Sequence, residues 1–316
     1  MTIFIQKTCL YSALVVAALS IAACGQTAPD KTATDMTEQT STVDRASADI
    51  GDLRNGGVQV TRINMPEQFE RGEKIVAYEG PGWESDKVGF RLYLDERNAL
   101  DIFGKKTDAI VLSTVGRGND YHAMADWGMD ILKVGNSLGA GGFGIFKDGE
   151  VVQIGEAAGY SAEVSTDNND SAAVVVTHSQ SIACGGDVRA QYSIEAGERI
   201  SRVSVRGDCN YPYAAGMIIH PDTQEMTSSS PGDWQYIARY GEQSLIPDGL
   251  GMALFYKASD VARVGKDNDD HYIVFKDNVS PNYYTAAAWS QEKGGLKDAA
   301  EFASWLDTTQ RTLNAQ

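Results

Sequence analysis

Two histidines lie among polar and turn residues and are the first candidates for acid–base chemistry. His122 follows Tyr121 in the segment 119–130, and His220 ends the apolar run 217–219. Imidazole transfers protons near neutral pH, and a positioned acid or base accelerates a reaction by about 10²- to 10⁴-fold. We therefore predict that His122 and His220 act as the acid–base pair, with Tyr121 as an alternative proton donor.

The other two histidines have different surroundings. His178 ends the apolar segment 174–178, so it is expected to have a structural role in the core. His271 follows the acidic run 267–270 and is expected in a solvated turn.

The segment 88–95 alternates between apolar and polar side chains, which is typical of a strand. Phe90 and Leu92 would face the core, whereas Arg91 and Tyr93 would face a polar groove. Guanidinium groups bind carboxylates through two parallel hydrogen bonds, so an anionic ligand is expected there. An ordinary solvated strand face would explain the same pattern. The predicted ligand-binding side chains of this group are Arg91, Tyr93, Arg97, Lys133 and Glu79.

Tryptophans flanked by glycine and charged residues occur at Trp83 and Trp127. Indole faces stack on the apolar faces of sugar rings, and acidic or amide neighbours bind hydroxyl groups. We predict both as stacking platforms in a carbohydrate groove. Alternatively, each one anchors a long loop to the fold.

The charge balance and the motif search exclude several kinds of partner. The chain has 316 residues and a net charge of −16, so it repels nucleic acid at long range. There is no GxSxG elbow and no P-loop. The glycine pattern 139–144 matches GxGxxG, but a hairpin signal follows it where a dinucleotide site needs a helix. No cofactor is predicted. A divalent metal is conceivable only if His122 and Asp126 share a helix face.

The first residues predict export and lipidation. A lysine, an apolar stretch and small residues precede Cys24, as in a lipoprotein signal peptide over residues 1–23. Cys24 would carry the lipid, and Gly25 after it favours the outer membrane of the cell envelope. Residues 24–57 have no aromatic side chain and are expected to form a flexible tether.

Residues 58–316 are expected to form one domain. Cys184 and Cys209 remain as an even pair, which indicates a disulfide in an oxidising compartment. The segment from 296 to 313 has a helical apolar face, whereas the strand signals fit a large antiparallel β-sandwich with a C-terminal helix. Further strand signals are at 144–147, 151–154, 172–177, 199–206, 214–219, 251–256 and 283–289.

Several long blocks resemble a bacterial family of lipoproteins with a domain of unknown function. These are 78–95 (YEGPGWESDKVGFRLYLD), 101–105 (DIFGK), 120–133 (DYHAMADWGMDILK) and 137–142 (SLGAGG). The family is associated with pectin and ulvan breakdown, and one member type is an ulvan oligosaccharide dehydratase. The resemblance implies a galactose-mutarotase-like supersandwich. It carries over no catalytic residue, so the roles given above come from residue chemistry.

The resulting functional prediction is a carbon–oxygen lyase. It would dehydrate the terminal uronic acid of an acidic oligosaccharide to a 4,5-unsaturated uronate, with an arginine neutralising the carboxylate and a histidine removing the C5 proton. The alternatives are a sugar epimerase of mutarotase type and a glycan-binding lipoprotein without catalysis.

Overall fold

The computed structural model describes residues 44–316. The signal peptide, Cys24 and residues 24–43 of the expected tether lie outside the described residues. The prediction of a tether as far as residue 57 is wrong for its last part. Residues Ala46–Asp49 form strand β1, which pairs with residues 82–85, and the side chains of Ala46, Ala48 and Ile50 are buried. Small alternating apolar residues are sufficient for a strand that another sheet covers.

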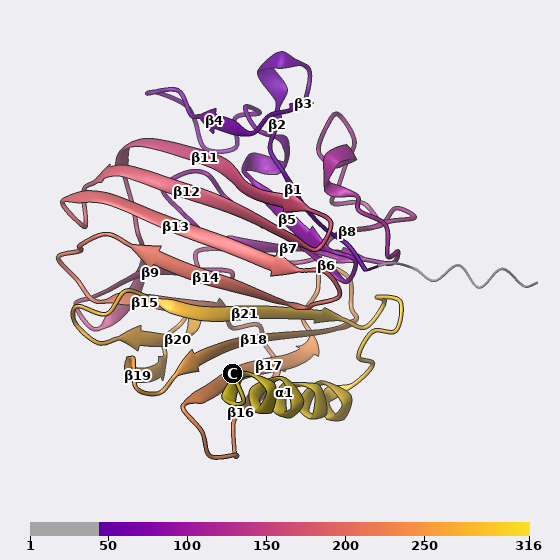
Figure 1. Ribbon diagram of the computed structural model, residues 1–316, viewed down its shortest axis with the longest axis vertical. Coiled ribbons are helices and arrows are strands. Elements are labelled where there is room, and N and C mark those ends of the chain that lie inside the picture. The colour runs from indigo at the N-terminus through magenta and orange to yellow at the C-terminus, as the bar shows by residue number, and fades with distance from the viewer. Residues whose placement is uncertain (1–43) are drawn as a thin grey trace, which may run out of the picture. The chain divides into compact units, whose positions relative to one another are not determined.

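The described chain forms two layers of antiparallel strands (Figure 1). One layer is a nine-stranded sheet, and the other consists of two five-stranded sheets. The order in the large sheet is β16 (Gln224–Thr227), β17 (Trp234–Glu242), β18 (Gly249–Lys257), β21 (Asn282–Trp289), β14 (Ile200–Arg206), β13 (Gly186–Glu195), β12 (Ser171–Ser181), β11 (Ala157–Asn168) and β4 (Arg62–Asn64).

The second layer contains the two smaller sheets. The first has the order β1 (Ala46–Asp49), β5 (Gly82–Ser85), β6 (Val88–Leu92), β7 (Leu100–Lys105) and β8 (Gly128–Asp130). The second has the order β10 (Glu150–Gln153), β9 (Ala140–Lys147), β15 (Tyr213–Ile218), β20 (Asp270–Phe275) and β19 (Val261–Lys266). A short pair, β2 (Gly51–Asp52) and β3 (Val58–Gln59), and three 3₁₀ turns, η1 (Leu53–Asn55), η2 (Ala77–Glu79) and η3 (Leu112–Thr114), complete this layer.

The main core lies between the layers. Phe90 and Leu92 from β6 meet Tyr192 from β13 and Val203 from β14, and all four are fully buried. The prediction that Phe90 and Leu92 of segment 88–95 face the core is therefore confirmed. Because one face of β6 fills the core, the other face carries Arg91 away from it.

Helix α1 (Ala299–Asn314) covers the outer face of β17 and β18 (Figure 1). The Asp298 side chain accepts hydrogen bonds from two backbone N–H groups and caps its first turn. Phe302 and Leu306 are fully buried against the sheet. Gly251 permits this approach, since a Cβ there would lie 2.6 Å from the Phe302 ring. No helix of residues 44–316 is long and apolar enough to cross a membrane.

The fold class predicted from the sequence is confirmed: an all-β antiparallel sandwich with a C-terminal helix. Of the glycine pattern 139–144, Gly139 precedes β9 and the rest lies within this strand, and a Cβ on Gly139 would lie 1.9 Å from the Leu100 carbonyl oxygen. Asp148 and Gly149, both at positive φ, form the β9–β10 hairpin. His178 is buried in the core, as expected. The prediction for His271 is wrong, because it lies in β20 with 2% exposure.

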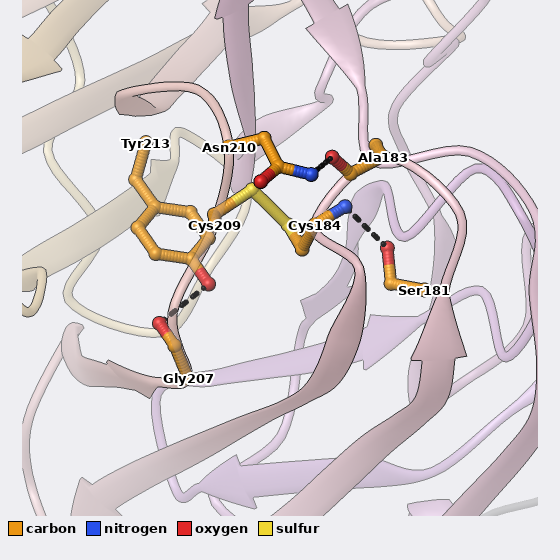
Figure 2. The surroundings of a disulfide bond; sticks show 7 residues. All are labelled: Ser181, Ala183, Cys184, Gly207, Cys209, Asn210 and Tyr213. Carbon is orange, nitrogen blue, oxygen red and sulfur yellow. Dashed lines mark hydrogen bonds between the residues drawn. A yellow bond between two sulfur atoms is a disulfide. The ribbon is translucent and has the colours of Figure 1, made fainter.

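A disulfide joins Cys184 and Cys209, the pair predicted from the cysteine count (Figure 2). It links the loop between β12 and β13 to the loop after β14. The Asn210 side chain donates to the Ala183 carbonyl oxygen beside it. The disulfide thereby holds together two loops whose cysteines are 25 residues apart in the sequence.

Candidate active site

The outer face of the first five-stranded sheet is covered by η2, η3 and the segment 106–127. Buried charges hold this cover in place. The Glu84 carboxylate accepts an ion-paired hydrogen bond from Lys105 Nζ at 2.6 Å and further hydrogen bonds from the N–H groups of Val111 and Leu112. Likewise, Arg117 from the cover pairs with Asp49 of β1 at 2.8 Å. Polar groups under a covering loop stay buried only when they are paired in this way.

Arg91 lies at the centre of this face and is 1% exposed. Its Nη2 donates to Asp101 Oδ2 and to Asp130 Oδ2, each at 2.7 Å, and to the Tyr93 hydroxyl at 2.8 Å. Its Nη1 donates to the Tyr78 carbonyl oxygen at 2.9 Å. Asp101 is directly opposite Arg91 in the pairing of β6 with β7, and Asp130 ends β8. Three neighbouring strands thus assemble one charged cluster.

The pKa values of Asp130 and Arg91 in this cluster are both raised. Burial raises the pKa of Asp130 well above its ordinary value, and the neighbouring Asp101 carboxylate raises it further, whereas Arg91 lowers it. Burial opposes the charge on Arg91, but Asp101 and Asp130 keep its pKa above the ordinary value. Two carboxylates that share one buried cation cannot both ionise freely. Asp130 is therefore suited to hold a proton.

Tyr121 and His122 connect this cluster to solvent. The Tyr121 hydroxyl lies 3.3 Å from Arg91 Nη1, and the Tyr121 ring lies 4.3 Å from the His122 ring, centroid to centroid. His122 Nε2 is 3.5 Å from Asp130 Oδ2, while 56% of the His122 side chain is exposed. This separation exceeds an ordinary hydrogen bond, but catalytic contacts often shorten when substrate binds.

A strained turn holds the other side of the site. Tyr78 has φ of 42° and Glu79 has φ of 68°, a left-handed conformation that side chains seldom adopt. Gly80 follows because a Cβ at this position would lie 1.8 Å from the Leu92 carbonyl oxygen. Backbone strain of this kind is concentrated at functional sites. Here it directs the Tyr78 carbonyl oxygen and the Glu79 carboxylate towards Arg91, with Glu79 Oε1 3.8 Å from Arg91 Nη1.

These residues border a cavity of ≈ 850 Å³. Its lining includes Lys74, Tyr78, Glu79, Asp120, Tyr121 and His122. Lys74 is exposed and makes no ion pair within residues 44–316. The volume falls in the range of about 300–1,000 Å³ that is typical of ligand sites. The cavity thus offers a free cation, a histidine and a tyrosine to one ligand.

The predicted ligand-binding role of Arg91 is corrected by this geometry. Its side chain does not line the cavity, because Asp101 and Asp130 saturate its guanidinium. Arg97 is occupied in the same way: its guanidinium pairs with Asp95 and with Glu79 at 2.9 Å and stacks on the Tyr93 ring at 3.7 Å. Tyr93 is itself buried. Of this group, only Glu79 borders the cavity directly.

His220 and Lys133 lie elsewhere. They line a second cavity of ≈ 630 Å³ with Asp222, Glu242 and Ser244, and none of these residues borders the first cavity. The pairing of His122 with His220 is therefore not supported. Burial lowers the pKa of His220, and Lys133 lowers it further.

The two tryptophans are not equivalent. Trp83 is fully buried, stacks on Tyr192 at 4.8 Å and donates from Nε1 to Ser201 Oγ at 2.8 Å. The prediction of a stacking platform is wrong for Trp83, since its strand faces the core and its polar atom has a buried partner. Trp127 is half-buried and packs edge-on against Phe103 at 6.0 Å, which anchors the covering segment.

Asp101, Asp130 and Lys74 were missed by the sequence reasoning. For Asp101 the sequence did contain an indication, because Asp101, Phe103 and Lys105 alternate with apolar or small residues in segment 100–105, as the residues on one face of a strand do.

The condition under which a metal was expected, a helix that carries both His122 and Asp126 on one face, is not met. Segment 119–127 is not helical, and within residues 44–316 no three His, Cys, Asp or Glu side chains converge as metal ligands would.

Comparison with known proteins gives a family and one distant structure. No curated protein matches the chain. A crystal structure described as a putative aldose 1-epimerase from Klebsiella pneumoniae subsp. pneumoniae MGH 78578 is similar over 85% of this chain and 96% of its own, at 9% identity and a TM-score of 0.37. A likeness of this size carries no argument about chemistry. The family model described as "Domain of unknown function (DUF4861)" matches residues 16–316, nearly the whole sequence. The chain therefore belongs to the DUF4861 family.

Proposed function

We propose that this protein is a carbohydrate-active lyase that dehydrates the terminal uronic acid of an acidic oligosaccharide. The observation that supports this most is the convergence of His122, Tyr121 and Lys74 on one cavity, with the Arg91–Asp130 cluster behind them. Elimination next to a carboxylate needs a base, an acid and a cation, and these three side chains are chemically suited to those roles.

In the proposed reaction the C5–H and C4–O bonds break, a C4=C5 double bond forms and water leaves. Lys74 neutralises the substrate carboxylate, which makes the C5 proton acidic. The imidazole of His122 takes this proton. With its raised pKa, Asp130 is suited to stay protonated on the Nε2 side of His122, while Asp120 Oδ1 lies 3.5 Å from His122 Nδ1 and would stabilise the imidazolium that forms.

Tyr121 donates its hydroxyl proton to the departing 4-hydroxyl group. The resulting phenolate is stabilised by the Arg91 guanidinium 3.3 Å away. Burial raises the pKa of Tyr121 while Arg91 lowers it, so the tyrosine keeps its proton until the leaving group takes it. The proton on His122 then returns to Tyr121, whose ring is stacked beside it.

The two cavities provide a matched test. The protein is incubated with saturated uronate-ended oligosaccharides, and the absorbance of the unsaturated product is followed. We expect His122→Ala to lower the rate by about 10²- to 10⁴-fold, Tyr121→Phe to lower kcat with little change in KM, and His220→Ala to leave the rate unchanged. Equal loss in both histidine variants, or no product from ulvan, pectin and alginate fragments, would contradict the proposal.

The epimerase alternative uses the same site and is separated by mass. An epimerase changes the anomer ratio and leaves the mass of the sugar unchanged, whereas dehydration removes one water. A glycan-binding protein without catalysis would bind the sugar equally well after His122→Ala, with no product in any variant. The signal peptide, Cys24 and the outer-membrane location belong to the same proposal, since a secreted lyase would meet such polymers outside the cell.

A further inference from the structure

The second cavity, which we call the His220 cavity, lies where three separate segments of the chain meet. It has a volume of ≈ 630 Å³, and its walls come from the residues after β8, the residues after β15 and the end of β17 with the loop that follows. The Leu245 N–H donates to the Ile131 carbonyl oxygen at 2.8 Å and joins the first wall to the third. The polar side chains of the lining are Lys133, His220, Asp222, Glu242, Gln243 and Ser244.

The turn that begins at His220 is fixed in the same way. The Thr223 hydroxyl donates to the His220 carbonyl oxygen at 2.9 Å and accepts from Arg239 Nε at 2.8 Å. Arg239 lies on β17 and is 7% exposed, so its guanidinium joins the second wall to the third. A site whose walls are already fixed loses little conformational entropy when a ligand binds.

Three charged side chains at this cavity have no partner. Lys133, Asp222 and Glu242 are exposed, and within residues 44–316 none of them forms an ion pair or a side-chain hydrogen bond. The ammonium group and the two carboxylates therefore do not neutralise one another by contact, although they border one cavity. Each keeps its full hydrogen-bonding capacity for a ligand.

Two further side chains of the lining contain a buried atom without a partner. Gln243 is 3% exposed, and its Nε2 donates to the carbonyl oxygens of Arg239 and Leu250 at 3.2 and 2.7 Å. Both donors of the amide are thereby used, and its Oε1 has no hydrogen bond; nor does Nε2 of His220. Buried polar atoms are nearly always paired, so an unpaired one calls for an explanation. A hydroxyl group in the cavity would supply the missing bonds once these side chains turn slightly.

The mixture of charges selects against a ligand with a net charge. An anion would be attracted by Lys133 and repelled by Asp222 and Glu242, whereas a cation would meet the opposite forces. A neutral polyol avoids both repulsions, because its hydroxyl groups donate to carboxylates and accept from an ammonium group. Burial lowers the pKa of His220 and Lys133 lowers it further, so the neutral ring offers one donor and one acceptor.

The size and the apolar part of the lining fit a sugar ring. Pro221 and Leu245 are exposed and offer apolar surface to the C–H groups of the ring. The volume lies within the range of about 300–1,000 Å³ that is typical of ligand sites. A free amino acid would also meet charges of both signs, but its two charged groups would leave most of the six polar side chains without a partner.

We propose that the His220 cavity binds a neutral sugar, whose hydroxyl groups donate to Asp222 and Glu242 and accept from Lys133. This inference does not depend on the reaction proposed at the His122 cavity, because the two cavities share no residue. The His220 cavity would bind the sugar without transforming it, as a second glycan site of the same domain.

Calorimetric titration of the whole protein with matched sugars provides the first test. D-galactose and D-glucose are compared with D-galacturonate and D-glucuronate, which differ from them only by the carboxylate at C6. We expect saturable binding of at least one of the neutral sugars and weaker binding of the corresponding uronate to this cavity. Glycine, which carries both charges and no hydroxyl group, should not bind.

Variants of exposed residues provide the second test. Glu242→Ala and Lys133→Ala remove side chains that have no partner in the described fold, so the midpoint of thermal unfolding should not change. We expect each of them to bind the neutral sugar about tenfold more weakly. Glu150→Ala is the matched control, since Glu150 is an exposed glutamate of β10 that borders neither cavity. It should bind as the wild type does. His122→Ala should also bind normally, so failure of the proposed reaction would not affect this result.

The opposite results are equally clear. No binding of either neutral sugar, or equal binding by Glu242→Ala, Lys133→Ala and Glu150→Ala, would overturn the inference. Tighter binding of the uronates, if Lys133→Ala abolishes it, would also overturn it and assign the cavity to an anion. Binding of glycine in place of the sugars would assign it to an amino acid.

Discussion

At the residue scale, the Arg91 guanidinium has no donor left for a ligand. Its five N–H groups are directed at Asp101, Asp130, Tyr93, Tyr121 and the Tyr78 carbonyl oxygen. In the proposed reaction it is a positioning residue, which holds Tyr121 at the lining of the cavity and Asp130 behind it. In the proposed reaction the acid and the base are the more accessible members of the cluster, Tyr121 and His122.

Removal of Arg91 should be costly for stability. In Arg91→Met, the Asp101 carboxylate would remain buried without its cation even if Asp130 keeps its proton, and breaking a buried pair costs about 3–5 kcal/mol. We expect the free energy of unfolding measured in urea to fall by this amount. Arg263→Met, at an exposed position of β19, should change it little. A loss of less than about 1 kcal/mol in Arg91→Met would contradict the buried network.

At the element scale, alternation predicted strands well and strand partners poorly. Segment 88–95 showed in advance that Phe90 and Arg91 face opposite sides, and the structure agrees. The sequence does not say which strand lies beside β6, so Asp101 and Asp130 could not be assigned to Arg91. Trp83 was misplaced for a related reason: its glycine and charged neighbours resemble a loop, although β5 lies between β1 and β6 in the sheet.

Strand pairing also determines where the two candidate histidines lie. His122 and His220 were both assigned to polar or turn segments, but they line different cavities, which the order of the strands determines. The last part of the expected tether became β1 because its small alternating residues find a partner in β5. Segments whose signal is local, such as α1 and the β9–β10 hairpin, were predicted correctly.

The disulfide offers an element-scale prediction. It joins the loops at one end of the hairpin formed by β13 and β14, and a crosslink over 25 residues restricts the unfolded chain. In the chain-entropy model, Cys184→Ser with Cys209→Ser should lower the free energy of unfolding by about 3 kcal/mol. The His122 cavity shares no residue with these loops, so the rate constant for turnover in the folded protein should not change. Equal stability of the double variant and the wild type would contradict this account.

At the scale of the whole molecule, buried ionisable groups should give stability a maximum in pH. Burial lowers the pKa of His178 to about 4, and burial lowers that of His271 to about 4 as well. Their contribution is fully present above the unfolded pKa of about 6.5 and is lost as pH falls towards 4. Burial raises the pKa of Asp270 to about 8, so its ionisation destabilises the fold as pH rises from about 4 to 8.

The contributions of the two histidines and of Asp270 to stability depend on pH in opposite directions, and the change from one to the other occurs near pH 6.5. Below it the two histidines outweigh Asp270, because the unfolded chain binds more protons, and stability falls with acidification. Above it Asp270 acts without them, and the summed contribution of these three groups to stability falls as pH rises. Urea unfolding from pH 5 to 8.5 should show this maximum, and Asp270→Asn should flatten the alkaline side. An unchanged alkaline slope in that variant would exclude Asp270 as a cause.

The proposed chemistry is tested most directly by the fate of the C5 hydrogen. The wild-type protein is incubated with an oligosaccharide whose terminal uronate carries deuterium at C5, and the products are weighed by mass spectrometry. We predict a product that has lost the C5 deuterium together with the 4-hydroxyl group, so that it has the same mass as the product of the unlabelled sugar. It should form more slowly than from the unlabelled sugar and be nearly absent with His122→Ala. A product that keeps the deuterium, or a sugar whose mass does not change at all, would contradict the assignment of His122 as the base of a dehydratase.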